Sequence, residues 1–116
     1  MFYISKTMEI SASHSLKLDY ESPCNNLHGH NWKITVHCKS DKLNNNGMIT
    51  DFSTIKKVLN TVLDHTNLNK SNYFENINTT AENMSFIITK LIPNCYKTEI
   101  WETENNYACY EKDEDE

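Results

Sequence analysis

The stretch HGHNWKITVHCK, residues 28–39, alternates between apolar and polar side chains and predicts a half-buried β-strand. Its even positions begin with two histidines and form one mainly apolar face: His28, His30, Trp32, Ile34, Val36 and Cys38. The odd positions are mainly polar, so His37 is expected on the opposite face. His28 and His30 point to the same side of the chain and provide half of a metal site.

A second alternating segment, residues 2–14, carries a candidate third ligand. Its even positions form a mostly apolar face, broken by Lys6, that ends at His14. If the two strands pair as an antiparallel hairpin, then His14, His28 and His30 converge on the core side of the sheet. Three imidazoles without a fourth protein ligand are typical of a catalytic zinc site with an open position. The alternative is three unrelated histidines.

The connection between these strands, residues 15–27, is long for a hairpin and carries Cys24. A bound cation lowers the pKa of a neighbouring thiol and makes the thiolate a usable base or nucleophile. Alternatively, Cys24 is a fourth ligand that closes a structural zinc site. The other cysteines, at positions 38, 95 and 109, are expected to be small apolar side chains without a catalytic role.

Two helices are predicted in the second half of the chain. Apolar residues at helical spacing follow Asp51 and Ser53, either of which can cap a first helix. A second helix is expected to begin after Thr79 or Thr80 and to end at Pro93.

Strands are expected at residues 97–103 and 107–110, joined by a turn, and Met48-Ile49 is interpreted as a short strand end. The order β-β-α-α-β-β predicts an α+β domain. Its antiparallel four-stranded sheet would have two helices on one face. Such a sheet keeps two open edges, and pairing edges between subunits would remove them, so we expect an oligomer.

Two further sites carry candidate chemistry. Asp64 and His65 close the first helix, and an adjacent acid and imidazole can form a general acid/base pair. The alternative is a helix end at which His65 offsets the dipole. Glu102 follows Trp101 near a strand end, where a carboxylate can grip the paired N–H groups of a pterin or guanine edge. The alternative there is a solvated strand glutamate.

Length and composition fit a single domain over residues 1–116, with an acidic tail at 112–116. All 11 basic residues are lysines and the formal net charge is -5, which argues against a nucleic-acid partner. No apolar run reaches transmembrane length, so no membrane partner is expected. The absence of a signal-peptide pattern and of closely spaced cysteines predicts reduced thiols and a cytoplasmic location.

Six segments, in this order, resemble the 6-pyruvoyl-tetrahydropterin synthase superfamily, and together they span nearly the whole chain. They are SASH (11–14), Cys24 with HGH (28–30), GMITDF (47–52), LDH (63–65) followed by LN (68–69), NTTAEN (78–83) and WET (101–103). The resemblance implies the tunnelling fold, or T-fold. In this fold the sheets of several subunits join into a barrel by oligomerisation, with active sites at subunit interfaces. A homo-hexamer is favoured, with a tetramer as the alternative.

The same resemblance implies a role for each candidate residue. Zinc would bind the three histidines, and Cys24 would be the catalytic thiolate. Asp64 and His65 would be the proton-transfer pair. Glu102 would anchor the pterin, and Thr80 would line its pocket. Because the chain has no arginine, lysines such as Lys17 are expected to bind a triphosphate.

Two details of the sequence bear on the reaction. The spacing Cys-x3-His-Gly-His resembles the bacterial 6-carboxy-tetrahydropterin synthases of queuosine biosynthesis, whereas ETENN at 102–106 resembles the pyruvoyl enzymes. The resemblance implies a zinc-dependent lyase that converts 7,8-dihydroneopterin triphosphate to 6-carboxy-tetrahydropterin, acetaldehyde and triphosphate. The alternative is a 6-pyruvoyl-tetrahydropterin synthase, and a remoter one is a non-catalytic module stabilised by zinc.

Overall fold

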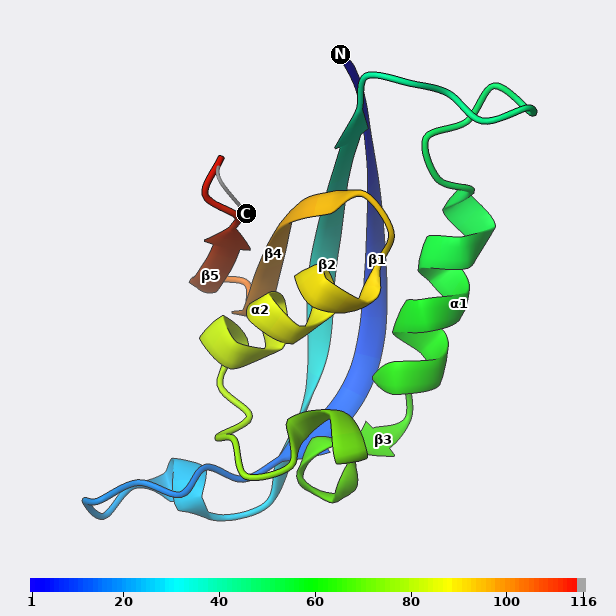
Figure 1. Cartoon of the computed structure of the whole chain (residues 1–116). Coiled ribbons are helices and arrows are strands. Elements are labelled where there is room, and N and C mark those ends of the chain that lie inside the picture. The colour runs from blue at the N-terminus through cyan, green and yellow to red at the C-terminus, as the bar shows by residue number, and fades with distance from the viewer. Residues whose placement is uncertain (115–116) are drawn as a thin grey trace.

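One sheet organises the molecule, and the computed structural model describes it within residues 1–114 (Figure 1). Its five strands lie in the order β3-β1-β2-β4-β5. Their bounds are β1 Phe2–His14, β2 His28–Ser40, β3 Thr66–Asn67, β4 Cys95–Thr103 and β5 Asn106–Glu111. The four long strands pair antiparallel, as the alternation predicted.

The sheet has one strand more than the four expected. β3 pairs parallel with the end of β1, where Ala12 lies opposite Thr66 and Ser13 opposite Asn67. Two residues are too few to show an alternating pattern, so this strand could not be predicted from the sequence. β3 therefore covers only the last part of the outer edge of β1.

Both predicted helices form, and both lie on the same side of the sheet (Figure 1). α1, Phe52–Val62, begins at Asp51, whose carboxylate accepts a hydrogen bond from the backbone N–H of Ser53. α2, Ala81–Leu91, begins at Thr80, whose hydroxyl accepts from the N–H of Asn83. Such caps typically contribute about 1 kcal/mol each. The α+β order expected from the sequence is confirmed.

The expected strand end at Met48-Ile49 is wrong. These residues belong to an irregular segment before α1, after a turn in which Gly47 has a φ of 77°. The carbonyl of Ile49 accepts a hydrogen bond from the side-chain amide of Asn94 at 3.0 Å. Because a side chain satisfies this backbone group, the segment needs no strand partner.

The core fills the space between the sheet and the helices. Even positions of the long strands supply one wall, and the inner faces of the helices supply the other. Fully buried members include Ile10, Trp32, Ile34, Val36, Ile100, Ile55, Leu59, Met84 and Ile88. Burying a side chain of this kind contributes about 1.5–3 kcal/mol. The indole N–H of Trp32 donates to the carbonyl of Ala12 at 3.1 Å, so the core ends in a satisfied polar group directly below His14 and His30.

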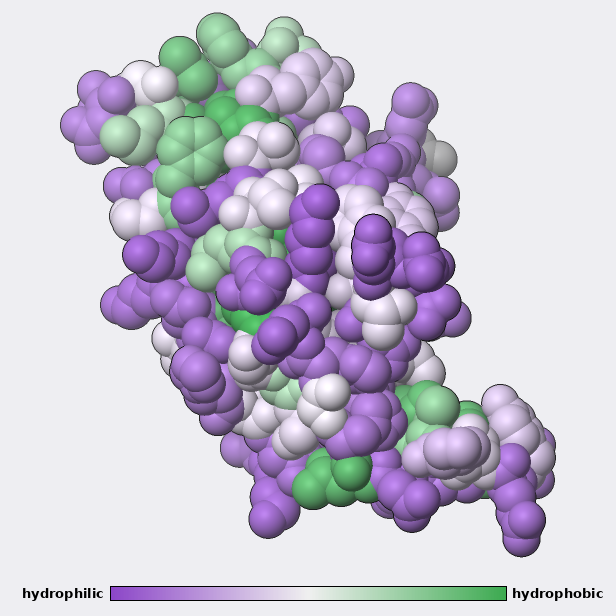
Figure 2. Space-filling view, turned by 180° about the vertical axis from the view of Figure 1, so that it is seen from behind, coloured by the Kyte–Doolittle hydropathy of each residue, from purple (hydrophilic) through white to green (hydrophobic). Residues whose placement is uncertain are grey.

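The opposite face of the sheet carries no helix and is mainly hydrophilic (Figure 2). Hydrophobic side chains gather at the end where β1 begins, where Phe2, Leu43, Met48 and Phe52 are exposed around a shared hollow. None of the described helices is long and apolar enough to cross a membrane.

The first residue of the expected acidic tail, Lys112, contacts the sheet through its backbone. The backbone N–H of Lys112 donates to the carbonyl of Tyr96 at 2.8 Å, so this residue still follows the sheet. Residues 115–116 of the expected tail lie outside the described residues.

Candidate functional site

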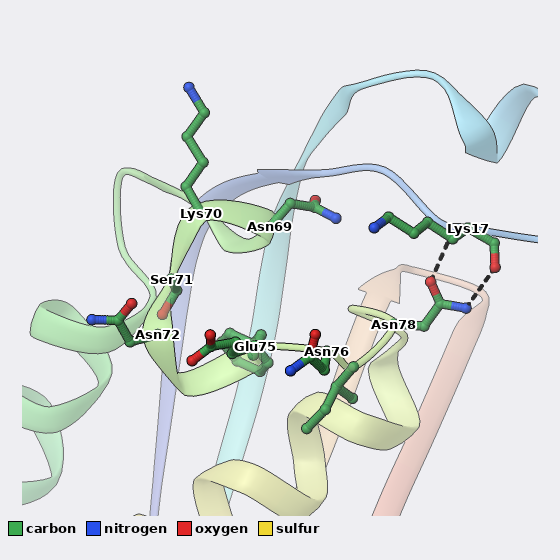
Figure 3. A pocket seen from close by; sticks show the side chains of 10 residues that line it. Lys17, Asn69, Lys70, Ser71, Asn72, Glu75, Asn76 and Asn78 are labelled. Carbon is green, nitrogen blue, oxygen red and sulfur yellow. Dashed lines mark hydrogen bonds between the residues drawn. The ribbon is translucent and has the colours of Figure 1, made fainter.

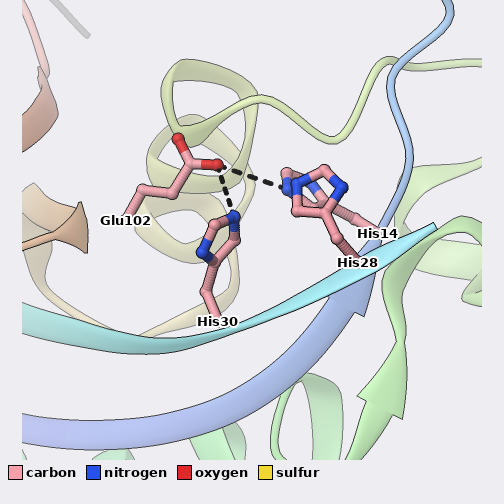
Figure 4. Close-up of side chains that lie close together, drawn as sticks. All are labelled: His14, His28, His30 and Glu102. Carbon is pink, nitrogen blue, oxygen red and sulfur yellow. Dashed lines mark ion pairs between the residues drawn. The ribbon is translucent and has the colours of Figure 1, made fainter. Parts of the chain in front are cut away.

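The three predicted histidines converge at one end of the sheet (Figure 4). The register of β1 and β2 sets His14 opposite His28 and Ala12 opposite His30, so all three rings project from the core face. Ring centroids lie 4.6 Å apart for His14 and His28, 4.8 Å for His28 and His30, and 5.4 Å for His14 and His30. The convergence inferred from strand alternation is therefore present in the structure.

Backbone carbonyls orient two of these rings. Nδ1–H of His14 donates to the carbonyl of Thr79 at 2.7 Å, and Nδ1–H of His28 donates to that of Asn26 at 2.7 Å. A carbonyl can only accept, so the proton must lie on Nδ1 and the lone pair on Nε2. This arrangement is the one in which a histidine presents Nε2 to a metal.

Glu102 completes the cluster from β4, with its carboxylate directed at the rings (Figure 4). Its Oε1 lies 3.3 Å from Nε2 of His14 and 2.9 Å from Nε2 of His30. These are ion-pair distances without hydrogen-bond geometry, since neither buried nitrogen has a hydrogen-bond partner within residues 1–114. Buried polar atoms without a partner are rare in folded proteins, so these two Nε2 atoms indicate a binding site for a ligand.

The donor set of this cluster fits a zinc ion. Within residues 1–114, one ligand atom from each of His14, His28, His30 and Glu102 lies within 4.8 Å of the others. Imidazole nitrogen with carboxylate oxygen is a common zinc donor set. Burial is the main cause that lowers the pKa of His14 below its usual value, and the neutral form is the one that binds metals.

Sequence reasoning did not join Glu102 to the histidines, although a signal was present. β4 pairs with β2 so that Lys33 lies opposite Trp101, and Glu102 then follows on the face of Trp32 and His30. The alternation of side chains along β4, combined with this register, would have placed the Glu102 carboxylate at the cluster. The register itself depends on a tertiary pairing that the sequence does not show.

Cys24 lies in the short 3₁₀ helix Pro23–Asn25, in the loop that leaves the same end of the sheet. Its carbonyl accepts from the N–H of Leu16 at 2.8 Å, which ties the two sides of the loop together. Its thiol is half-buried and is not part of the ligand cluster formed by the described residues. The fourth group near the histidines is thus Glu102 and not Cys24.

Asp64 and His65 follow α1 at the outer edge of β1. Oδ1 of Asp64 accepts from the N–H of Ser11 at 2.9 Å, and the N–H of His65 donates to the carbonyl of Ser11 at 2.6 Å. Oδ2 of Asp64 lies 3.5 Å from Nε2 of His65, whose side chain is 83% exposed. The ring borders a hollow of about 560 Å³ that His30 also lines. Ser11, Ser13 and Asn31, which alternate with the three histidines along β1 and β2, line the same hollow, so it opens on the face of the sheet opposite the cluster.

A further hollow lies beside Glu102. It has a volume of about 380 Å³ and is lined by Ala81 and Glu82 of α2, by Glu102, and by β5 from Asn106 to Cys109. Thr80 caps the helix at its border. The carboxylate of Glu102 thus lies between the histidine cluster and a space open to a ligand.

Comparison with known proteins places the chain in one family, since the model of the 6-pyruvoyl tetrahydropterin synthase family matches residues 3–113. The 6-carboxy-5,6,7,8-tetrahydropterin synthase of Synechocystis sp. is 33% identical, over 95% of this chain and 93% of that protein. The 6-pyruvoyl tetrahydrobiopterin synthase of Homo sapiens is also 33% identical, over 92% of this chain and 89% of that protein.

A solved structure agrees with these relatives. The 6-pyruvoyl tetrahydropterin synthase of Caenorhabditis elegans superposes with a TM-score of 0.74 at 25% identity, over 97% of this chain and 96% of that one. The arrangement of strands and helices described above is thus that of the T-fold. The chain belongs to the 6-pyruvoyl tetrahydropterin synthase family.

Proposed function

We propose that this protein is a zinc-dependent lyase that converts 7,8-dihydroneopterin triphosphate to 6-carboxy-5,6,7,8-tetrahydropterin, acetaldehyde and triphosphate. The observation that carries the proposal is the cluster of His14, His28 and His30, in which two buried Nε2 atoms have no hydrogen-bond partner among the described residues. Membership of a family of pterin synthases supports the substrate class. We expect such an enzyme in the cytoplasm.

His14, His28 and His30 would hold the zinc ion through Nε2. When bound, zinc supplies a Lewis acid that stabilises negative charge developing on the hydroxyl oxygens of the substrate side chain. The carbonyls of Thr79 and Asn26 keep two of the rings in the required tautomer, which preserves their basicity toward a metal.

Glu102 would anchor the pterin ring. A carboxylate accepts two N–H groups of a pterin edge in a charge-assisted, two-point contact. The hollow beside Glu102, next to the helix that Thr80 caps, offers space for such a ring. Anchoring the ring there would set the substrate side chain against the histidine cluster, where orientation lowers the barrier.

Cys24 and the Asp64–His65 pair would move protons on opposite sides of the substrate. The thiolate sulfur of Cys24 would accept or return a proton on one side. On the other, His65 would exchange a proton at Nε2 while the Asp64 carboxylate, 3.5 Å away, stabilises its charged form. Asp64 is held by the backbone of Ser11, which makes it a fixed partner for the exposed ring.

The positions of these groups favour an active site completed between copies of the chain. The His65 ring faces outward, and Cys24 is not part of the histidine cluster. β3 covers the outer edge of β1 only at Ala12 and Ser13, and β5 forms the other edge of the sheet. Joining β1 of one copy to β5 of the next would close a barrel in a homo-oligomer, with a hexamer favoured.

The test is incubation of the zinc-loaded protein with 7,8-dihydroneopterin triphosphate, followed by mass spectrometry of the products. Acetaldehyde together with 6-carboxy-tetrahydropterin supports the proposal. Triphosphate release with a pyruvoyl product and no acetaldehyde would assign 6-pyruvoyl-tetrahydropterin synthase instead. That alternative is favoured by the human relative, which is as similar in sequence as the Synechocystis enzyme.

A non-catalytic zinc module is the remaining alternative. The Cys24→Ala variant separates it from an enzyme. Retained zinc with turnover reduced by about 100-fold or more is the result expected for a proton-transfer residue. Loss of zinc and of the fold together would show a structural site instead.

A further inference from the structure

A hollow of about 630 Å³ lies beside Lys17, in the chain that leaves β1 (Figure 3). One wall is the chain that leaves β1, and the other is the segment from Asn69 to Asn78. Most of the side chains that line it carry N–H donors: Lys17, Asn69, Lys70, Asn72, Asn76 and Asn78. Glu75 is the only carboxylate among the described lining residues. A concave surface rich in ammonium and amide donors suits an anion with several oxygens.

Two asparagine side chains hold the walls together. The N–H of Lys17 donates to Oδ1 of Asn78 at 2.8 Å, and Nδ2 of Asn78 donates back to the Lys17 carbonyl at 2.9 Å. Asn69 makes the same reciprocal pair with Ser15, at 2.8 Å in both directions. Each side-chain amide thus makes the two backbone hydrogen bonds that a neighbouring strand would otherwise make. Together they fix the backbone that carries Lys17. Figure 3 shows the Lys17 ammonium directed toward the Asn69 amide.

Two short segments of backbone connect the hollow to the histidine cluster. Asn78 adjoins Thr79, whose carbonyl binds the His14 ring. Lys17 follows His14 by three residues, so its Cα lies no more than about 11 Å from that of His14. An elongated substrate whose reacting carbons lie at the cluster can therefore reach the hollow with its charged end.

We propose that this hollow binds the triphosphate end of the pterin substrate. Lys17 and Lys70 supply the positive charge, and Asn78 and Asn69 act as positioning residues for Lys17. This inference rests on the proposed function, which supplies the triphosphate ester as ligand. The chain carries a formal net charge of -5, so a polyanion needs a local group of cations to bind.

The test compares 7,8-dihydroneopterin triphosphate with unphosphorylated 7,8-dihydroneopterin, each titrated calorimetrically against the full chain. A Cys24→Ala background limits turnover, and KM of the otherwise unchanged enzyme provides a second readout. Lys17→Met and Lys70→Met are each expected to weaken binding of the triphosphate by about tenfold, because each removes a charge-assisted contact. Affinity for the unphosphorylated pterin should stay unchanged.

Two controls make the comparison specific. Lys57→Met removes an exposed cation of α1, outside the hollow, and should leave both affinities unchanged. Glu75→Gln removes the opposing carboxylate and should strengthen triphosphate binding by about two- to threefold. Opposite effects of Lys17→Met and Glu75→Gln on the same ligand cannot arise from a general loss of folding.

The positioning role of Asn78 needs a double-mutant cycle. Asn78→Ala should weaken triphosphate binding when Lys17 is present and have a much smaller effect in the Lys17→Met background. Equal effects in the two backgrounds would overturn the positioning role. Unchanged triphosphate affinity in both lysine variants, or equal losses for both ligands, would overturn the subsite. Failure of the parent chain to bind either pterin would instead reject the proposed function.

Discussion

Two clusters of histidine and glutamate lie on opposite faces of the same sheet, and they differ in whether their polar atoms have hydrogen-bond partners. On the core face, Nε2 of His14 and of His30 is buried beside Glu102, without a hydrogen-bond partner in the part of the chain that the structure describes. On the helix-free face, Nε2–H of His37 donates to Oε1 of Glu99, and the Tyr107 hydroxyl donates to Oε2 at 2.7 Å. The first cluster has free ligand atoms, whereas both carboxylate oxygens of the second are paired.

The pKa shifts on the helix-free face agree with a closed network. Burial alone would raise the pKa of Glu99, but hydrogen bonds from Tyr107 and His37 outweigh it and lower the pKa below its usual value. The hydrogen bond to Glu99 raises the pKa of Tyr107, so the phenol keeps its proton. Residue type alone therefore does not identify a ligand site, and unpaired atoms are the more informative sign.

The largest expected difference concerns metal affinity. His28→Ala should lower zinc affinity by at least about 100-fold, because it removes one of the three proposed nitrogen ligands. His37→Ala, the matched change on the other face, should alter it less than about twofold, since His37 is already paired with Glu99. Competition with a chromogenic zinc chelator measures both. Equal losses in the two variants would remove the distinction between the faces.

The two glutamates should differ next in pterin binding. Glu102→Gln keeps the shape of the side chain but removes its charge, and it should weaken binding of 7,8-dihydroneopterin by about 10- to 100-fold. Glu99→Gln should leave pterin binding unchanged. Fluorescence titration with the zinc-loaded variants tests this. If Glu102→Gln instead released zinc, Glu102 would be a metal ligand and not the pterin anchor.

Stability should show the reverse order. Glu99→Gln is expected to lower the free energy of unfolding by about 1 kcal/mol, because the side chain paired with His37 loses its charge. The effect is modest because this face is partly exposed to solvent. Glu102→Gln should change it little in the metal-free protein, since Glu102 makes no directed hydrogen bond with the rings. Urea unfolding of both variants provides the measurement, and a larger loss for Glu102→Gln would be inconsistent with this account.

The smallest effect is a pH dependence. The pKa of Glu99 is lowered in the folded protein, so its stabilisation is present above the unfolded pKa, about 4.3. It is lost as pH falls through the folded value. The difference in unfolding free energy between the parent and Glu99→Gln should therefore shrink as pH falls from about 5 to about 3, below the range in which imidazoles titrate. A difference constant over that window would contradict the assignment.

Alternation made much of this structure predictable from sequence. Period-two patterns at 2–14 and 28–39 predicted β1 and β2, and the even positions of His14, His28 and His30 predicted their convergence. His37 is at an odd position, so the same alternation correctly predicted that it lies on the opposite face from the cluster. Local patterns suffice here because each strand buries one face, which fixes the direction of every side chain.

The features that were missed depend on tertiary pairing. β3 is too short to alternate, and the place of Glu102 follows from the β2–β4 register. The expected strand at Met48-Ile49 failed because an Asn94 side chain, distant in sequence, satisfies the Ile49 carbonyl. The hydrogen bonds from Asn69 and Asn78 to the chain after β1 likewise join segments that no local pattern connects.

The most direct test of the metal assignment is anomalous diffraction from crystals grown with zinc, recorded above and below the zinc absorption edge. We predict one anomalous peak per chain, among His14, His28 and His30, and none beside His37 and Glu99. A peak at His37 and Glu99, or no peak among the three histidines, would contradict the assignment of the core-face cluster as the metal centre.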